Sequence, residues 1–109
     1  MRLNEYQAMS ARTMNPSLTP AERLLDAAAG LSEEGGEVLG TLRKHLYQQR
    51  PLDRERLQEE LGDALWCLAA VATAAGMSLG EVADANLAKL ARRHPHGFSS
   101  QASARPPED

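Results

Sequence analysis

The chain has 109 residues, 42% hydrophobic and only 4% aromatic, so it suits one small domain, and a core of Leu, Ala, Val and Met favours helices over sheets. Its formal charge of -3, without a basic stripe, argues against nucleic acid as a partner. The sequence has no signal segment and no apolar run of membrane-spanning length, and its single cysteine cannot form an internal disulfide. We therefore expect an all-α protein in the cytoplasm, with no membrane partner.

A short first helix is predicted for residues 3–14, because Asn15 precedes Pro16 and a residue before proline is disfavoured in the α region. A second helix begins at the capping sequence TPAE, residues 19–22, and extends to about residue 49. One face of this second helix carries an apolar stripe formed by Leu24, Ala28, Leu31, Val38, Leu42 and Leu46.

A link with a central proline, residues 48–53, separates the second helix from a third over residues 54–75, so the two should be antiparallel neighbours. From Ala64 to Ala75 the third helix is apolar nearly all the way round. A single protomer of this size can hardly surround such a helix, so we expect an obligate homodimer or homotetramer with the third helix at an interface.

A fourth helix is predicted to begin after Ser78, at a second capping pattern, and to end near Arg93, before a proline. The helical domain then spans residues 1–98. Residues 99–109 are polar and rich in proline, and we expect them to form a disordered tail.

Two pairs of acidic residues mark the candidate site. Glu34 and Glu37 on the second helix, and Glu60 and Asp63 on the third, are each three residues apart, so each pair shares one face of its helix and the pairs can converge. Four carboxylates without His or Cys suit Mg²⁺, with Mn²⁺ as a substitute, rather than zinc. Because Mg²⁺ usually takes only one or two carboxylates plus substrate phosphates, this many acids predict ions around a polyphosphate.

Glycines lie between these acids. Gly35 and Gly36 separate the first pair and Gly62 lies within the second, although each glycine inside a helix costs about 1 kcal/mol relative to Ala. Their positions predict that some group approaches the backbone closely there. The alternative interpretation of the acids is a solvated, Glu-rich helix face.

The fourth helix carries a second set of candidate residues. Asn86 falls within its apolar stripe, where an amide without a partner costs about 1 to 3 kcal/mol. Lys89 and Arg93 follow on the same side, so an amide and two cations can face the acids or bound phosphates. Alternatively, the cations only complement the helix dipole. The rest of the stripe comprises Leu79, Val82, Ala83, Leu87 and Leu90.

These motifs resemble those of the MazG-like nucleotide pyrophosphohydrolases, all-α relatives of dimeric dUTPases and phosphoribosyl-ATP pyrophosphatase. The family's E-E-x-x-E signature matches residues 33–37, and its E-x-x-D signature matches residues 60–63. The stretch from Asn86 to Phe98 looks like the family's N-x-x-K and R-x-P-x-x-F ending. Together the elements cover about residues 30–98.

The resemblance implies a four-helix protomer whose second and third helices form the site. It implies Mg²⁺-dependent hydrolysis of a nucleoside triphosphate between the α and β phosphates, which releases the monophosphate and pyrophosphate. A dUTPase, a phosphoribosyl-ATP pyrophosphatase and a non-catalytic oligomeric interaction module remain alternatives. Carried over by motif, the roles are metal ligation by Glu34, Glu37, Glu60 and Asp63, orientation of the attacking water by Glu33 as base, and contacts to phosphates or the metal site from Asn86, Lys89 and Arg93.

Overall fold

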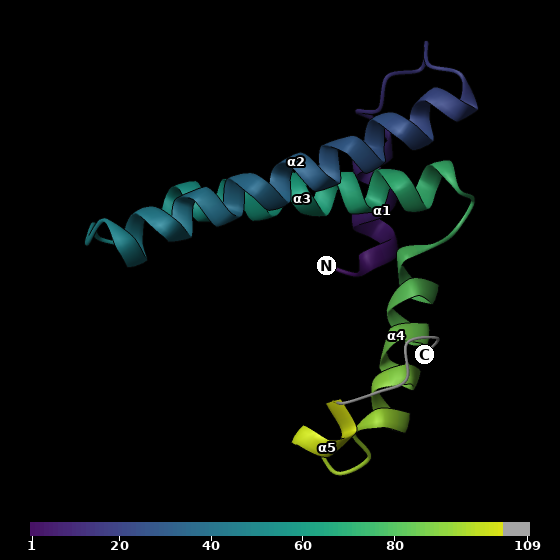
Figure 1. Ribbon diagram of the computed structural model, residues 1–109. Helices are drawn as coiled ribbons and strands as arrows, with labels where there is room; N and C mark the ends of the chain where they lie inside the picture. Colours follow the sequence, from purple (N-terminus) through teal and green to yellow (C-terminus); the bar gives the residue numbers. More distant parts are fainter. Residues whose placement is uncertain (104–109) are drawn as a thin grey trace.

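The computed structural model describes residues 1–103, over which the chain forms helices and no strand. Figure 1 shows a long antiparallel hairpin of α2 and α3, with α4 extending away from the end of α3. The all-α prediction and the predicted helix order are therefore confirmed. The helices are α1 (Leu3–Ala11), α2 (Pro20–Tyr47), α3 (Arg54–Ala74), α4 (Leu79–Arg93) and the single turn α5 (Ser100–Ser103).

Side chains cap the starts of the three long helices, at Thr19 and Ser78 as predicted and also at Asp53. Thr19 and Glu22 form a reciprocal capping box, with Glu22 N–H donating to Thr19 Oγ1 at 3.2 Å and Thr19 N–H donating to Glu22 Oε1 at 2.9 Å. Asp53 caps α3 and Ser78 caps α4, each accepting the backbone N–H three residues later. These bonds satisfy donors that have no partner inside the helix, so the helix starts are determined locally.

The structure differs from the predictions at the end of α1 and within the predicted tail. The helix α1 ends at Ala11 rather than at residue 14, because the next N–H groups donate to carbonyls three residues back, as in the bond from Thr13 to Ser10 at 3.0 Å. Such bonds tighten and end a helix. The turn α5 falls within the predicted tail, and the rest of that tail, residues 104–109, lies outside the described residues.

Small residues bring α2 and α3 close together. A Cβ placed on Gly30 would lie 2.8 Å from Cys67 Sγ, so a larger residue at this crossing would force the Cys67 side chain to move. By contrast, apart from adjacent residues and nearby backbone of the same helix, no atom of residues 1–103 lies within 4 Å of a Cβ placed on Gly35, Gly36 or Gly62. The described part of the protomer therefore does not make the close approach predicted at those three glycines.

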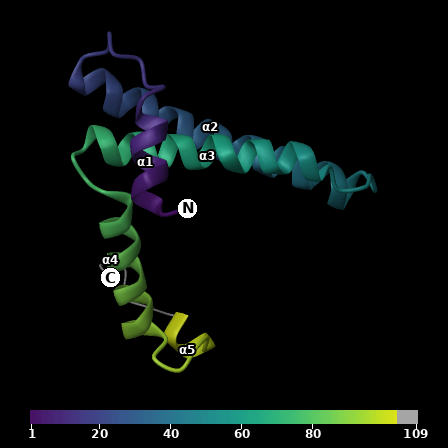
Figure 2. The same cartoon turned by 180° about the vertical axis from the view of Figure 1, so that it is seen from behind.

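The helix α3 lies between α2 and α1, as Figure 2 shows from behind. The side chains of α1 also hold the start of α4. Gln7 donates to Thr73 Oγ1 at 3.0 Å and accepts the Leu79 N–H at 2.7 Å, while Asn4 Oδ1 accepts the Gly80 N–H at 2.8 Å. Because these N–H groups belong to the first turn of α4, α1 determines the direction in which α4 leaves α3.

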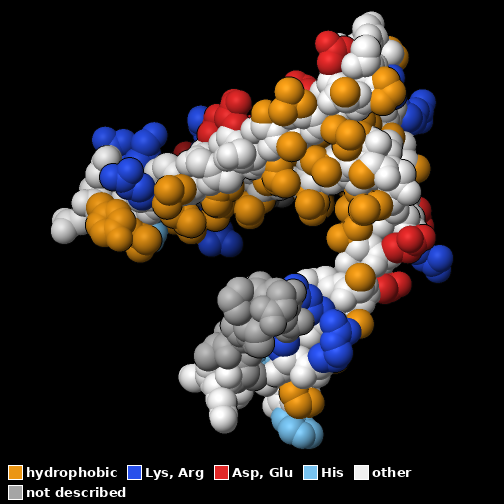
Figure 3. Space-filling view, turned by 45° about the vertical axis from the view of Figure 1, so that its right-hand side comes forward, with side chains coloured by type: hydrophobic (Ala, Val, Ile, Leu, Met, Phe, Trp, Pro, Cys, Tyr) orange, Lys and Arg blue, Asp and Glu red, His pale blue; other side chains and the backbone are white. Residues whose placement is uncertain are grey.

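The protomer leaves much apolar surface exposed. On α3, Ala69, Ala70 and Ala72 are buried, whereas Leu65 and Leu68 are 37% and 42% exposed. Figure 3 shows hydrophobic side chains in a band along the face of the hairpin that looks toward α4. No single helix among residues 1–103 has the length and hydropathy to cross a membrane. Only α3 and α4 taken together have that length and hydropathy, and a bend of 102° separates them. The exposed large apolar side chains on α2, α3 and α4 include Leu24, Leu25, Leu39, Leu46, Leu61, Leu65, Leu68, Leu87 and Leu90.

Candidate functional site

The two acidic pairs lie on the neighbouring helices α2 and α3, and the carboxyl group of Glu34 is within electrostatic range of the other acids. Burial raises the pKa of Glu34, and the charges of Glu37, Asp63, Glu33 and Glu60 raise it further. Glu34 is half-buried, and its Oε2 atom is buried with no hydrogen-bond partner among residues 1–103. The fold therefore places the other four predicted acids within electrostatic range of Glu34 and concentrates negative charge there.

Glu60 lies in a different environment from Glu34. Its carboxylate is only 4% exposed and accepts hydrogen bonds from Thr41 Oγ1 at 2.5 Å and from Arg56 Nε at 3.2 Å. The bond from Thr41 lowers the pKa of Glu60 most, and the bond and charge of Arg56 lower it further, against the opposing effect of burial. Glu60 is thus held ionised and in place, whereas Glu34 carries an unpaired buried oxygen.

Thr41 and Arg56 are site residues that were not predicted from the sequence. Arg56 precedes Glu60 by four positions on α3, and Thr41 follows Glu37 by four positions on α2. Residues four apart share a helix face, so the spacing in the sequence places each of them on the same face as an acid. The facing of Thr41 and Glu60 across the hairpin depends on the packing of two helices and has no signal in the sequence.

The donor set fits a hard divalent cation. Every candidate ligand is a carboxylate, and the unpartnered Oε2 of Glu34 is an oxygen with free acceptor capacity. Within residues 1–103, no three His, Cys, Asp or Glu side chains are grouped closely enough to hold a metal ion. Binding of a metal ion would therefore require side-chain rotations around Glu34, while Glu60 is bonded to Thr41 and Arg56.

The three predicted phosphate-contacting residues lie apart from the acids. The helix α4 makes its main tertiary contacts with α1 and extends away from the hairpin (Figure 1). Asn86 is exposed, and Lys89 and Arg93 are half-buried. The stripe that contains Asn86 is not enclosed by the protomer, since Val82, Leu87 and Leu90 are also exposed. Within one chain, the fold does not bring α4 to the carboxylates.

One aromatic residue lies near the acids on the side of α1. Trp66 follows Asp63 by three positions on α3, is half-buried, and donates its Nε1–H to Thr13 Oγ1 at 2.7 Å. A narrow cavity beside it is lined in part by Asn15 and Asp26. The segment after α1 therefore lies against the end of the acidic region nearer the C-terminus of α3.

Comparison with known proteins places this arrangement in a family. The family model for the MazG nucleotide pyrophosphohydrolase domain matches residues 23–98. That span contains the five predicted acids of the site and all of α4, and it leaves out α1. No curated protein and no solved structure matches the chain. Because the match covers most of the chain and includes both acidic motifs, this protein belongs to the MazG nucleotide pyrophosphohydrolase domain family.

Proposed function

We propose that this protein hydrolyses nucleoside triphosphates between the α and β phosphates, with Mg²⁺ as cofactor, and releases the monophosphate and pyrophosphate. The observation that carries the proposal is the buried oxygen of Glu34, which has no hydrogen-bond partner among residues 1–103 and lies within electrostatic range of Glu37, Glu60 and Asp63. This concentration of carboxylate charge, which the ion pair between Arg56 and Glu60 offsets only in part, is costly unless cations bind there. Membership of the family supports the reaction type.

In this mechanism Glu34, Glu37, Glu60 and Asp63 would hold the ions. When bound, Mg²⁺ supplies positive charge that stabilises the charge developing on the phosphate oxygens. Glu60 is pre-oriented, since Thr41 and Arg56 hold both of its oxygens. Glu33 is exposed next to Glu34, where it can accept a proton from a water molecule. The water oxygen bonds to the α phosphorus, the bond to the bridging oxygen breaks, and pyrophosphate leaves.

The products test this assignment. Purified protein with Mg²⁺ should convert at least one nucleoside triphosphate from a panel of canonical and modified dNTPs into its monophosphate and pyrophosphate, as resolved by phosphorus NMR. Including dUTP and phosphoribosyl-ATP in the panel distinguishes the alternative activities within the enzyme class. Release of a diphosphate with orthophosphate would overturn the cleavage site. A panel without any turnover would instead favour a non-catalytic interaction module.

We also propose that the chain acts as a homodimer or homotetramer. The support is the exposed apolar face of α3, with Leu61, Leu65 and Leu68 more than a third exposed, together with an α4 that points away from its own acids (Figure 1). A second copy would cover this face. In such an assembly Asn86, Lys89 and Arg93 would contact phosphates bound at a neighbouring copy.

Light scattering at micromolar concentration should therefore show no monomer. Leu68→Glu places a charge on the exposed face of α3 and should dissociate the assembly, whereas Glu55→Gln, a conservative change in the first turn of the same helix, should leave it intact. A helical, cooperatively melting wild-type monomer under these conditions would exclude the assembly.

A further inference from the structure

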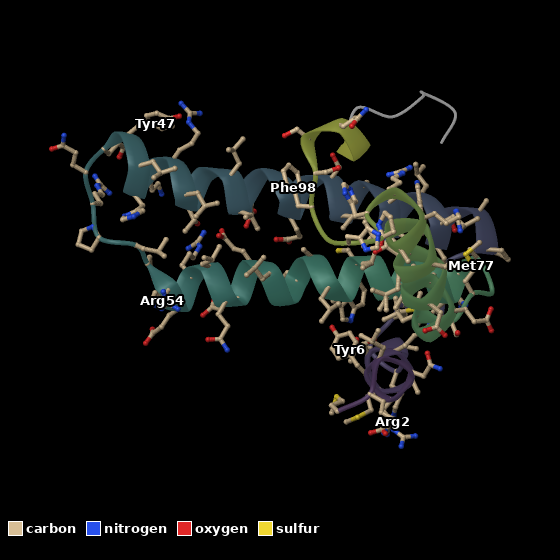
Figure 4. The ribbon with its side chains drawn as sticks, turned by 90° about the horizontal axis from the view of Figure 1, so that it is seen from below. Arg2, Tyr6, Tyr47, Arg54, Met77 and Phe98 are labelled. Carbon is tan, nitrogen blue, oxygen red and sulfur yellow. The ribbon has the colours of Figure 1, made fainter. Side chains whose placement is uncertain are left out.

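A cavity of about 320 Å³ opens at the free end of the α2–α3 hairpin, beyond the acids. Figure 4 marks this end with Tyr47 and Arg54, and Figure 3 shows Lys and Arg side chains gathered there. The cavity has contributions from the last turns of α2, the link and the first turn of α3. Its lining residues are Thr41, Lys44, Arg50, Pro51, Asp53 and Arg56.

The lining is strongly cationic. Lys44, Arg50 and Arg56 each carry a positive charge, and the single acid among the lining residues, Asp53, accepts the Arg56 backbone N–H at 3.0 Å as the cap of α3. The N-terminal end of α3 adds the positive end of its dipole. The net charge of the walls therefore favours an anionic ligand.

The link that carries Arg50 is held in a defined conformation. The Arg50 N–H donates to the Lys44 carbonyl at 3.4 Å, and His45 Nδ1 lies 2.7 Å from the Arg50 carbonyl oxygen. Gln49 adopts a positive φ of 54° at the turn, a conformation uncommon outside glycine. The backbone on this side of the cavity is thus tied to the last turns of α2.

The cavity adjoins the acidic site directly. Thr41 and Arg56 line the cavity, and both also donate hydrogen bonds to Glu60. Arg56 uses its Nε for Glu60, which leaves the outer nitrogens of the guanidinium for a second partner. Along α2, the seven residues from Glu37 to Lys44 span about 10 Å, so carboxylates and cations are two turns apart.

We propose that this cavity binds the two terminal phosphates of the substrate, which become the pyrophosphate leaving group. The assignment rests on the proposed function. Lys44 and Arg50 contact these phosphates, and Arg56 links them to Glu60. The α phosphate then lies beside the carboxylates, whose bound cations would offset the repulsion between the two anions, and the nucleoside extends the opposite way along the hairpin, toward Trp66 and α1. The terminal phosphates are thereby bound by the same chain that supplies the acids.

Calorimetric titration with inorganic pyrophosphate, in metal-free buffer of low ionic strength, tests the cavity without turnover. Lys44→Gln and Arg50→Gln should each weaken binding about tenfold or more, the usual effect of losing a charge-assisted contact. Arg43→Gln is the matched control, because it removes a positive charge from the same helix at an exposed position outside the cavity. Lys89→Gln tests whether pyrophosphate binds instead at the cation of α4.

Steady-state kinetics supply the second readout. Lys44→Gln should raise the KM for the triphosphate by a factor similar to its loss of pyrophosphate affinity, and Arg43→Gln should not. The inference is overturned if Lys44→Gln and Arg50→Gln bind pyrophosphate as tightly as Arg43→Gln, or if only Lys89→Gln weakens binding. Failure of the proposed function gives a different result, because the wild type would then hydrolyse no triphosphate. The pyrophosphate titration would still show whether the cavity binds phosphate groups.

Discussion

Replacing Glu33 by Gln should lower kcat by about 10²- to 10⁴-fold, the usual contribution of a general base, with little change in the affinity for Mg²⁺ or nucleotide. Glu33 is about 100° around α2 from Glu34 and is exposed, whereas Glu34 is half-buried. It is therefore placed to reach a water molecule at the edge of the acids rather than to hold an ion among them. Turnover assays and titration of Mg²⁺ with a non-hydrolysable nucleotide measure the two effects separately.

Glu55→Gln is the control for this substitution, because Glu55 is an exposed glutamate of α3 far along the helix from Asp63. It should retain normal kcat. Near-normal turnover of Glu33→Gln would make Glu33 a solvent-facing residue without a catalytic role. Loss of metal affinity in Glu33→Gln would instead identify it as a fifth ligand.

Replacing Glu34 by Gln should abolish Mg²⁺-dependent turnover and yet raise the melting temperature of the metal-free protein at neutral pH. Burial and the neighbouring acids raise the pKa of Glu34. Between the ordinary and the raised value, the folded state binds more protons than the unfolded state, so stability falls as pH rises through this range. Above it, ionised Glu34 destabilises the fold, and Gln removes that charge.

Melting curves in chelator across acidic to neutral pH measure this effect. The advantage of Glu34→Gln should be largest near neutrality and should vanish where Glu34 is protonated in both states, below about pH 4. Glu60→Gln is the matched contrast, because hydrogen bonds from Thr41 and Arg56 lower the pKa of Glu60. Its ionised form stabilises the fold, so the same chemical change should lower the melting temperature. A metal-free Glu34→Gln that melts below the wild type would contradict the electrostatic account.

Added Mg²⁺ and nucleotide should reverse the order of the melting temperatures, so that the wild type melts above Glu34→Gln. A ligand that binds only the folded state stabilises it by about 2.7 kcal/mol at a concentration one hundred times its Kd. The wild type should gain this stabilisation with Mg²⁺ and nucleotide, and Glu34→Gln should gain little of it. Equal gains in both proteins would show that Glu34 is not needed to hold the ion.

The helices and the acidic motifs were predictable from the sequence, because both depend on local spacing. The caps Thr19, Asp53 and Ser78 bond to backbone groups three residues away, so no distant residue is needed to place the helix starts. Likewise, the pairing of Glu34 with Glu37 on one face follows from helix geometry alone. Family membership agrees with the motifs.

Only the tertiary structure decided how these parts meet. The crossing of α2 and α3 brings Gly30 against Cys67. This crossing places Thr41 beside Glu60, and it lowers the pKa of Glu60 while that of Glu34 is raised. The direction of α4 depends on Gln7, more than 70 residues away along the chain, and it separates Asn86 from the acids of the same protomer. Contacts between side chains distant in the chain depend on the packing of whole helices, and local residue patterns do not encode them.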